Sequence, residues 1–308
     1  MRIRRALRIE PVPARRLRRA AAFMVAGGER SVGARARAEG LCRLARGRAP
    51  YPPWAWWARR GRRCCAAAMA LPTAGRVGML VVSPLGAVDV EHDAVIRVLQ
   101  RVGDAALAGK MAFVQALTNP DAEADRAVLE RAGFARLTEL LYLSCDPAEA
   151  AVAVAADDAL SWRTYGAFDD AELADVIDQT YEASGDCPAL SGLRSMDDVI
   201  AGHKAGGTFR PAWWALAYCD QRPAGVVLAN EAGGDKAEVV YMGVVPAFRG
   251  RGVGAALVGW AARQARAAGM ERLSLAVDTD NACARSVYAR FGFAVERRRV
   301  VHVRRREA

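Results

Sequence analysis

The residues best suited to chemistry lie around a glycine-rich turn in the last third of the chain. Val244-Val245-Pro246 ends an apolar run, and Arg249-Gly250-Arg251-Gly252-Val253-Gly254 follows just before a helical pattern begins. The first N–H groups of a helix have no partners within the helix, and the helix dipole adds partial positive charge there. Because glycines let an anion approach the backbone closely, this turn predicts a diphosphate site.

A second set of residues follows on a predicted helix. Asn281, Ala284 and Tyr288 are three and four residues apart, so they share one helix face, and Gly292-Phe293 closes the helix. The phenol of tyrosine has a reference pKa of about 10, and a phenol that stays protonated can act as a general acid. The alternative is that Tyr288 is only a packed aromatic side chain.

Both sets resemble the motifs of the GNAT acetyltransferase superfamily. Arg249, Gly252 and Gly254 match its pyrophosphate-loop pattern Arg/Gln-x-x-Gly-x-Gly/Ala, and a Val-x-Pro strand end precedes them. The string Asn-x-x-Ala-x-x-x-Tyr-x-x-x-Gly-Phe covers residues 281–293. The resemblance extends over residues 160–303.

The resemblance implies that acetyl-CoA, as co-substrate and with no metal, binds between strands 238–245 and 273–277. Backbone groups of Val244 and Val245 would then pair with the pantetheine arm, and Asn281 and Ala284 would line the same site. Tyr288 would protonate the departing thiolate, while a backbone N–H near Val244 polarises the carbonyl. The residues expected to hold the pyrophosphate through their backbone N–H groups are Arg249, Gly250, Arg251, Gly252, Val253 and Gly254.

The same resemblance implies a general base and an acceptor loop. Glu238 lies eight residues before Pro246, where many such enzymes carry a carboxylate that acts directly or through water; the alternative is a solvated carboxylate. Weaker candidates are Asp220, Glu231 and Tyr241. In the loop 184–194, Asp186 would attract a cationic amine and Arg194 an anionic group, unless both are surface charges.

The implied activity is N-acetyl transfer from acetyl-CoA to a primary amine of a small molecule or peptide. One alternative is acetylation of a cysteinyl amine, because the mycothiol synthases have a similar tandem layout. Another alternative is a non-catalytic, regulatory CoA-binding module.

Periodicity predicts an α/β fold in which the order β-α-α-β-β-β-α-β-α-β occurs twice. In the second half the expected elements are strand 161–165, helices 169–181 and 196–203, strands 212–219, 223–230 and 237–245, helix 252–268, strand 273–277, helix 281–291 and strand 293–303. In the first half they are strand 2–9, helices within 14–46, strands 54–58, 64–69 and 77–82, helix 94–107, strand 111–117, helix 122–132 and strand 137–143. We therefore expect two tandem GNAT folds, each a central mixed β-sheet flanked by helices.

The expected domains are residues 1–145 and 159–308, joined by an Ala-rich, acidic linker at 146–158. The first domain is predicted to be degenerate. Its turn at 83–93 lacks the glycine pattern and carries Asp89, Glu91 and Asp93, which would repel a diphosphate. Counted back from Gly133, Leu129 stands where Tyr288 does and Asp125 stands where Ala284 does. This half is therefore expected not to bind CoA.

Composition sets the remaining expectations. Residues 1–63 hold 18 Arg and 3 Glu, a surplus of 15 positive charges, and the remainder holds 26 basic and 31 acidic residues, so the net charge is +10. Since 41 of the 44 basic residues are Arg, compositional bias explains the surplus better than nucleic-acid binding, for which no recognition module is present. No apolar stretch approaches the about 20 residues that span a bilayer. A start that superficially resembles a signal peptide fits a strand followed by a helix equally well.

Cysteine and histidine usage favours a cytoplasmic protein without a metal site. The seven cysteines are odd in number and show no Cys-x-x-Cys spacing, and the histidines are only three. Reduced, buried thiols are the expectation.

Overall fold

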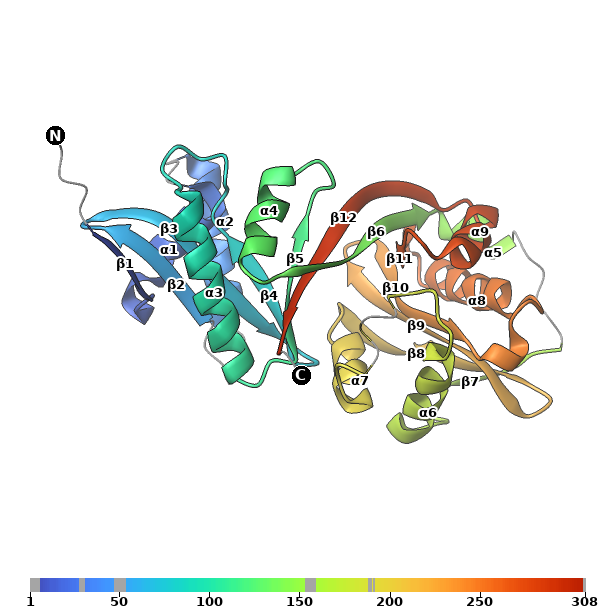
Figure 1. The fold of residues 1–308 in the computed structure, drawn as a ribbon. Coiled ribbons are helices and arrows are strands. Elements are labelled where there is room, and N and C mark those ends of the chain that lie inside the picture. The colour runs from blue at the N-terminus through green and yellow to red at the C-terminus, as the bar shows by residue number, and fades with distance from the viewer. Residues whose placement is uncertain are drawn as a thin grey trace. The chain divides into compact units, whose positions relative to one another are not determined.

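The computed structural model describes residues 6–27, 31–46, 54–152, 159–187, 190 and 192–306. It divides into two compact units, Met1–Leu137 with Val300–Ala308, and Thr138–Arg299. Both halves of the chain run through the expected order β-α-α-β-β-β-α-β-α-β (Figure 1). The predicted fold class, mixed sheets flanked by helices and repeated in tandem, is confirmed.

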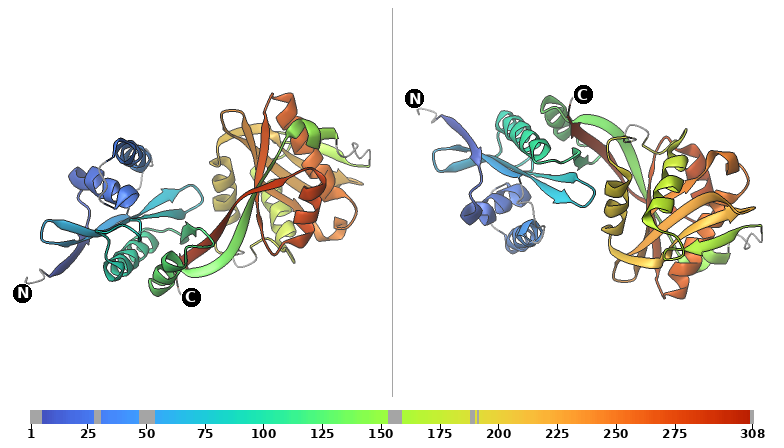
Figure 2. Two further views of the ribbon diagram at one scale, coloured as in Figure 1. Left: turned by 90° about the horizontal axis from the view of Figure 1, so that it is seen from above. Right: turned by 90° about the horizontal axis from the view of Figure 1, so that it is seen from below.

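Unit 1 is built around a strand of small residues. Residues 65–71 of β3 are all buried, and alternate side chains face opposite sides of the sheet. Ala66, Ala68 and Ala70 pack against α3 and α4, whereas Met69 and Leu71 pack against α1 and α2. The helix pairs therefore cover opposite faces, as Figure 2 shows for α1 and α3. The elements of the first half of the chain are β1 (Leu7–Pro11), α1 (Leu17–Ala26), α2 (Val32–Arg46), β2 (Trp54–Arg60), β3 (Arg63–Thr73), β4 (Val77–Val82), α3 (His92–Ala108), β5 (Phe113–Thr118), α4 (Glu123–Arg131) and β6 (Ala135–Cys145).

Unit 2 repeats this arrangement around two long antiparallel strands, β8 and β9. Asn230 on β9 is fully buried, accepts from Trp214 Nε1 at 2.9 Å and donates to the carbonyls of His203 and Gly206 at the end of α7. The other face carries α8, whose buried side chains join the same core. The elements of the second half of the chain are β7 (Ser161–Thr164), α6 (Asp170–Tyr181), α7 (Met196–Lys204), β8 (Thr208–Cys219), β9 (Arg222–Gly233), β10 (Lys236–Val244), α8 (Val253–Ala267), β11 (Arg272–Asp278), α9 (Ala282–Arg290) and β12 (Ala294–Arg305).

The two halves exchange their last strands. Residues 140–145 of β6 pair with β11, so the end of the first half completes the sheet of unit 2. Residues 300–305 of β12 pair with β5, so the end of the chain completes the sheet of unit 1. Leu141 and Leu143 are accordingly buried in the core of unit 2. The units therefore divide at 137/138 and 299/300, and not at the linker that composition suggested.

Part of the expected linker is helical. Pro147–Val152 forms α5, and Ala150 and Ala151 are buried in the core of unit 2, where α5 packs against α8. Alanine is the best helix former, so the composition that resembled a linker also suits a short buried helix. Residues 153–158, like residues 2–5 of the expected first strand, lie outside the described residues.

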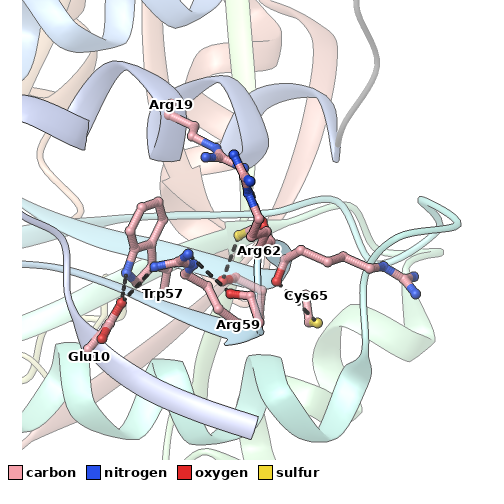
Figure 3. A network of polar contacts seen from close by, with 10 residues as sticks. Glu10, Arg19, Trp57, Arg59, Arg62 and Cys65 are labelled. Atoms are coloured by element: carbon pink, nitrogen blue, oxygen red, sulfur yellow. Dashed lines mark hydrogen bonds and ion pairs between the residues drawn. The ribbon is translucent and has the colours of Figure 1, made fainter. Parts of the chain in front are cut away.

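Arginines of the basic N-terminal segment have partners inside unit 1. Glu10 accepts from Trp57 Nε1 at 3.2 Å and from Arg59 Nη1 at 3.1 Å, and the Arg59 guanidinium lies 5.0 Å from the centroid of the Trp57 ring (Figure 3). Arg19 reaches the carbonyl of Arg62 at 3.1 Å. These arginines have a structural use, so the surplus of charge does not by itself indicate a polyanion site.

Three further properties concern the described part of the chain. None of its helices is long and apolar enough to cross a membrane. No group of three or more His, Cys, Asp or Glu is arranged to hold a metal ion there. All seven cysteines lie within it, and each is a free thiol.

The strand exchange predicts that the second half cannot fold by itself. A fragment of residues 159–308 lacks β6, so β11 loses its antiparallel neighbour and keeps only β10. Because Leu141 and Leu143 also leave the core, the free energy of unfolding should fall by at least about 4 kcal/mol. That cost is a large share of a typical domain stability. We expect this fragment to aggregate through its open strand edge, whereas a fragment of residues 138–299 should unfold cooperatively. Thermal circular dichroism and size-exclusion chromatography measure this, and equal melting of the two fragments would contradict the exchange.

Candidate active site

The site begins where the ladder between β10 and β11 stops. These parallel strands pair only from Lys236 and Arg272 to Val239 and Leu275. Against β9, the register of β10 shifts between Val239 and Tyr241, which marks a bulge that bends the strand. Beyond this point β10 and β11 continue without pairing to each other, so a wedge opens between them.

The wedge forms a cavity with a volume of about 810 Å³. Its walls come from the end of α6 and the following loop, from β10, from the glycine-rich turn, from the end of β11 and from α9. This volume lies in the range of small-molecule and cofactor sites. Of the predicted site residues, those that line it are Val244, Arg249, Gly250, Gly252, Gly254, Asn281, Ala284 and Tyr288.

The glycine-rich turn presents free space at the N-terminus of α8. Gly250 and Gly252 have φ values of 77° and 84°, in the left-handed region that favours glycine. A Cβ atom on either glycine would meet no atom within 4 Å, so both positions face open space. Gly252 is the N-cap of α8 and offers no capping side chain, so the N–H groups of the first turn are available to an anion.

Arg249 has a different role from the one that the motif suggested. Its backbone N–H donates to the carbonyl of Pro246 at 3.2 Å. Its guanidinium donates to four carbonyls, those of Val244 at 3.1 Å, Thr180 at 3.1 Å, Glu182 at 2.7 Å and Ala183 at 3.1 Å. Arg249 therefore holds the end of α6 and the following loop to the turn, and a diphosphate would have to compete with these bonds for its donors.

The backbone of β10 offers pairing groups at Val244 but not at Val245. The N–H of Val245 donates to Ala224 on β9 at 3.0 Å, and its carbonyl accepts from Phe248 at 2.9 Å. Because backbone groups alternate sides along a strand, those of Met242 and Val244 point toward the wedge. Met242, two residues before Val244, therefore faces the wedge, whereas the backbone groups of Val245 are already bonded within the protein.

Two other residues of the turn also lie outside the cavity lining. The Arg251 guanidinium lies 5.7 Å from the centroid of the Phe248 ring. The Val253 side chain is buried in the core. The Val253 side chain is therefore not available to an anion, whereas the exposed Arg251 side chain lies against Phe248, a residue of the cavity wall.

Helix α9 brings its three predicted residues to the cavity. The Asn281 side chain accepts from the N–H of Ala284 at 3.1 Å and so caps the helix. Tyr288 is 7% exposed, and its ring centroid lies 5.6 Å from that of Phe293. Burial and the nearby charge of Asp186 raise the pKa of the Tyr288 hydroxyl above its usual value. A phenol that is held protonated at the cavity wall has the properties of a proton donor.

Glu238 is not among the residues that line this cavity. It pairs with Asn230 across β9 and with Ser274 across β11, on the sheet face that also carries the half-buried Tyr142. Burial raises the pKa of its carboxyl, and the charge of Arg297 lowers it in part. The structure does not bring Glu238 to Tyr288, so a proton could reach Glu238 from the cavity only through water.

The weaker candidates for a base are used elsewhere or lack access. Asp220 lies in the β8–β9 turn, and Glu231 forms an ion pair with Arg210. Tyr241 does line the cavity, but its hydroxyl lies 2.6 Å from Thr180 Oγ1, whose own hydrogen is donated to the carbonyl of Ile177. Tyr241 must therefore donate to Thr180, and burial raises its pKa.

A carboxylate pair joins the loop after α6 to the end of β11. Asp186 Oδ1 accepts the N–H of Asp278 at 3.1 Å, and Asp278 Oδ2 accepts the N–H of Cys187 at 3.3 Å. Asp278 is 4% exposed, whereas Asp186 lines the open cavity. The sequence pattern points to Asp186 but not to Asp278. An acidic residue at the end of an otherwise apolar strand is the pattern that identifies Asp278.

In unit 1 the equivalent strands also separate, but the cavity between them is small. Its strands β4 and β5 pair only from Val77 to Met79, yet the equivalent cavity measures about 120 Å³ and is lined by Asp125 and Leu129. The acidic residues expected to repel a diphosphate are themselves paired, Glu91 with Arg60 at 3.0 Å and Asp89 with Arg63 at 3.0 Å. Ion pairs within unit 1 therefore neutralise two of the acidic residues that precede α3.

Known proteins share this architecture. The family model "Acetyltransferase (GNAT) family" matches residues 177–293, all of them in unit 2. A GCN5-related N-acetyltransferase from Sphaerobacter thermophilus is similar over 97% of this chain and 95% of its own, with 18% identity and a TM-score of 0.59. A tandem GNAT protein from the clavulanic acid biosynthesis pathway is similar over 97% and 98%, with 16% identity and a TM-score of 0.54. A search of curated proteins finds no match.

At under 20% identity, the solved structures show a shared fold. The family model matches a segment of unit 2, the unit that holds the cavity. The solved structures agree with the duplicated element order. Residues 177–293 of unit 2 match the GNAT acetyltransferase family, and the chain as a whole shares the fold of the GNAT structures above, a tandem GNAT protein among them.

Proposed function

We propose that unit 2 transfers an acetyl group from acetyl-CoA to a primary amine of a small molecule or peptide. The observation that carries this proposal is that one cavity is lined by the open edge of β10, the glycine turn before α8 and the buried Tyr288. These are a slot for an extended chain, a cradle for a diphosphate and a proton donor. They are the three parts that transfer from a coenzyme A thioester requires.

Binding is supported by the geometry of the wedge. An extended pantetheine arm can add to the open edge of β10 through the backbone of Met242 and the N–H of Val244, as a peptide adds to a sheet edge, while the carbonyl of Val244 is held by Arg249. Its diphosphate then meets the N–H groups from Gly250 to Gly254 and the positive end of the α8 dipole. A cavity of about 810 Å³ has room for this part of the coenzyme.

Direct attack is the chemistry that these residues favour. The amine nitrogen forms a bond to the thioester carbon, the carbon–sulfur bond breaks, and the Tyr288 hydroxyl gives its proton to the sulfur. The extra proton of the attacking nitrogen passes through water to Glu238, whose raised pKa makes it a stronger base than an ordinary carboxylate. Tyr288 regains its proton from solvent before the next turnover.

The test of this function is the release of free CoA thiol from acetyl-CoA in the presence of a panel of primary amines. A wild-type protein that binds acetyl-CoA but releases no thiol with any amine would instead be a binding module. Acetylation of a cysteinyl amine stays a prediction of the sequence, and cysteine derivatives belong in the panel.

The closed wedge of unit 1 predicts that the chain binds one molecule of acetyl-CoA. A cavity of about 120 Å³ that is lined by Asp125 and Leu129 is too small for a second coenzyme. Isothermal titration calorimetry should give a stoichiometry near one. A second binding event of similar affinity would show that unit 1 is not degenerate.

Replacing Gly252 by Ala should weaken acetyl-CoA binding at least about tenfold, which is 1.4 kcal/mol. The new methyl group points into open space at the turn and meets the diphosphate instead of the protein. The left-handed backbone adds a strain of about 1–2 kcal/mol. Gly269→Ala is the matched control, because Gly269 follows the other end of α8 with a φ of 72° and the same open surroundings. Equal affinity losses in both variants would assign the effect to strain alone.

Tyr288→Phe should lower kcat by about a hundredfold or more and change acetyl-CoA affinity less than threefold. Phenylalanine keeps the ring beside Phe293 and removes only the proton donor. Since the pKa of Tyr288 is raised, the wild-type kcat should not decline with pH up to about pH 10 through this group. Steady-state kinetics and calorimetry measure both effects, and turnover equal to that of the wild type would remove the acid role.

A further inference from the structure

The loop after α6 crosses the mouth of the wedge and is fastened on both sides of it. At the β10 side, Arg249 binds the carbonyls of Thr180, Glu182 and Ala183. At the β11 side, the Asp186 carboxylate accepts from the N–H of Asp278, and the Asp278 carboxylate accepts from the N–H of Cys187. The intervening Gly185 lies against Asn281, since a Cβ there would be 3.5 Å from its side chain. Asp186 is thus fixed in place over the cavity.

Asp186 differs from the other charged groups of the cavity wall. The Arg249 guanidinium donates to backbone carbonyls. Asp280 and Arg290 are exposed, as Asp186 is, so exposure does not distinguish Asp186 from them. The charge of Asp186 acts on Tyr181, Tyr241 and Tyr288, which all line the same cavity. Asp186 is exposed to the open cavity, yet the protein around it displaces enough water to raise the pKa of its carboxyl. Only one of its oxygens is committed to the Asp278 N–H by the bonds described above.

We propose that Asp186 is the residue that binds the acceptor as a cationic primary ammonium and orients its nitrogen toward the thioester, beside Tyr288. This inference rests on the proposed function of the same cavity and adds a substrate class to it, an amine that is protonated at neutral pH. The sulfur that Tyr288 protonates and the attacking nitrogen must both lie next to the thioester carbon. A fixed carboxylate near Tyr288 is therefore placed to receive the nitrogen, and it takes one proton as the ammonium becomes an attacking amine.

In this arrangement two carboxylates each accept one of the two protons that the ammonium nitrogen loses. Asp186 faces the cavity and holds the ammonium, whereas Glu238 lies outside the lining and is reached through water. A proton that moves from the ammonium to Asp186 leaves a neutral amine next to the thioester, and the second proton is lost only after the carbon–nitrogen bond forms. Asp186 and Glu238 each release one proton to solvent, and Tyr288, which gave its proton to the thiol, regains one from solvent, so each turnover releases one net proton.

Asp186→Asn tests this proposal, because the amide oxygen can still accept the N–H of Asp278 while the negative charge is lost. With the best acceptor among phenethylamine, glucosamine and lysine methyl ester, KM for the amine should rise at least tenfold at pH 7. KM for acetyl-CoA should stay within threefold. The rate with hydroxylamine, which is largely unprotonated at neutral pH, should change less than threefold. Glu182→Gln is the matched control: Glu182 is an exposed carboxylate of the same loop that does not line the cavity, and this variant should behave as the wild type.

The pH profile supplies a readout that a structural role would not move. The variant should regain activity as the pH approaches the pKa of the amine, because free amine then needs no carboxylate. An unchanged KM for the cationic amine would overturn the proposal. An equal loss with hydroxylamine would also overturn it, since it would show that Asp186 only shapes the loop.

Binding separates this inference from the proposed function. Calorimetry of the CoA-loaded protein should show that the wild type binds phenethylamine more tightly than its neutral isostere phenethyl alcohol, and that Asp186→Asn loses this preference. If no amine is acetylated, the proposed function fails while this binding difference still decides the role of Asp186. Absence of the preference in the wild type would overturn the inference even where acetylation is observed.

Discussion

The site of this protein depends on an interrupted β-ladder. After Val239 and Leu275, two parallel strands of one sheet stop pairing, although both continue. Unpaired backbone groups inside a protein are costly, so such a break persists only where other groups satisfy or cover them. Arg249 takes the carbonyl of Val244 at one end, and the Asp186–Asp278 bonds fasten the other end. The middle of the wedge stays open, and an extended ligand can complete it.

Arg249 belongs to the same arrangement. Its guanidinium ties the glycine turn to the loop that carries Asp186, because it donates to the carbonyls of Glu182 and Ala183. One side chain therefore joins two walls of the cavity. The positive φ values of Gly250 and Gly252 keep the turn itself open.

The two halves contain equivalent wedges, but only the wedge of unit 2 opens into a large cavity. In unit 1 the equivalent strands also part after three pairs, but Leu129 and Asp125 line the small space that remains. The exchanged last strands make each unit depend on a segment encoded in the other half of the chain. The first half is therefore needed for the structure of unit 2 even without a site of its own, because its last strand, β6, supplies a neighbour for β11.

The sequence by itself determined the element order in both halves, the turn before α8 and the helix face that carries Asn281, Ala284 and Tyr288. These follow from local rules, namely apolar period, glycine conformation and helix spacing. Tertiary structure alone decided that the last strands are exchanged, that 147–152 is a buried helix, that Glu238 lies outside the cavity and that Arg249 and Val245 are already hydrogen-bonded. Each of these depends on contacts between residues far apart in the chain. The pairing of Asp186 with Asp278, 92 residues later, is of the same kind, since no local pattern fixes which strand end a loop will meet.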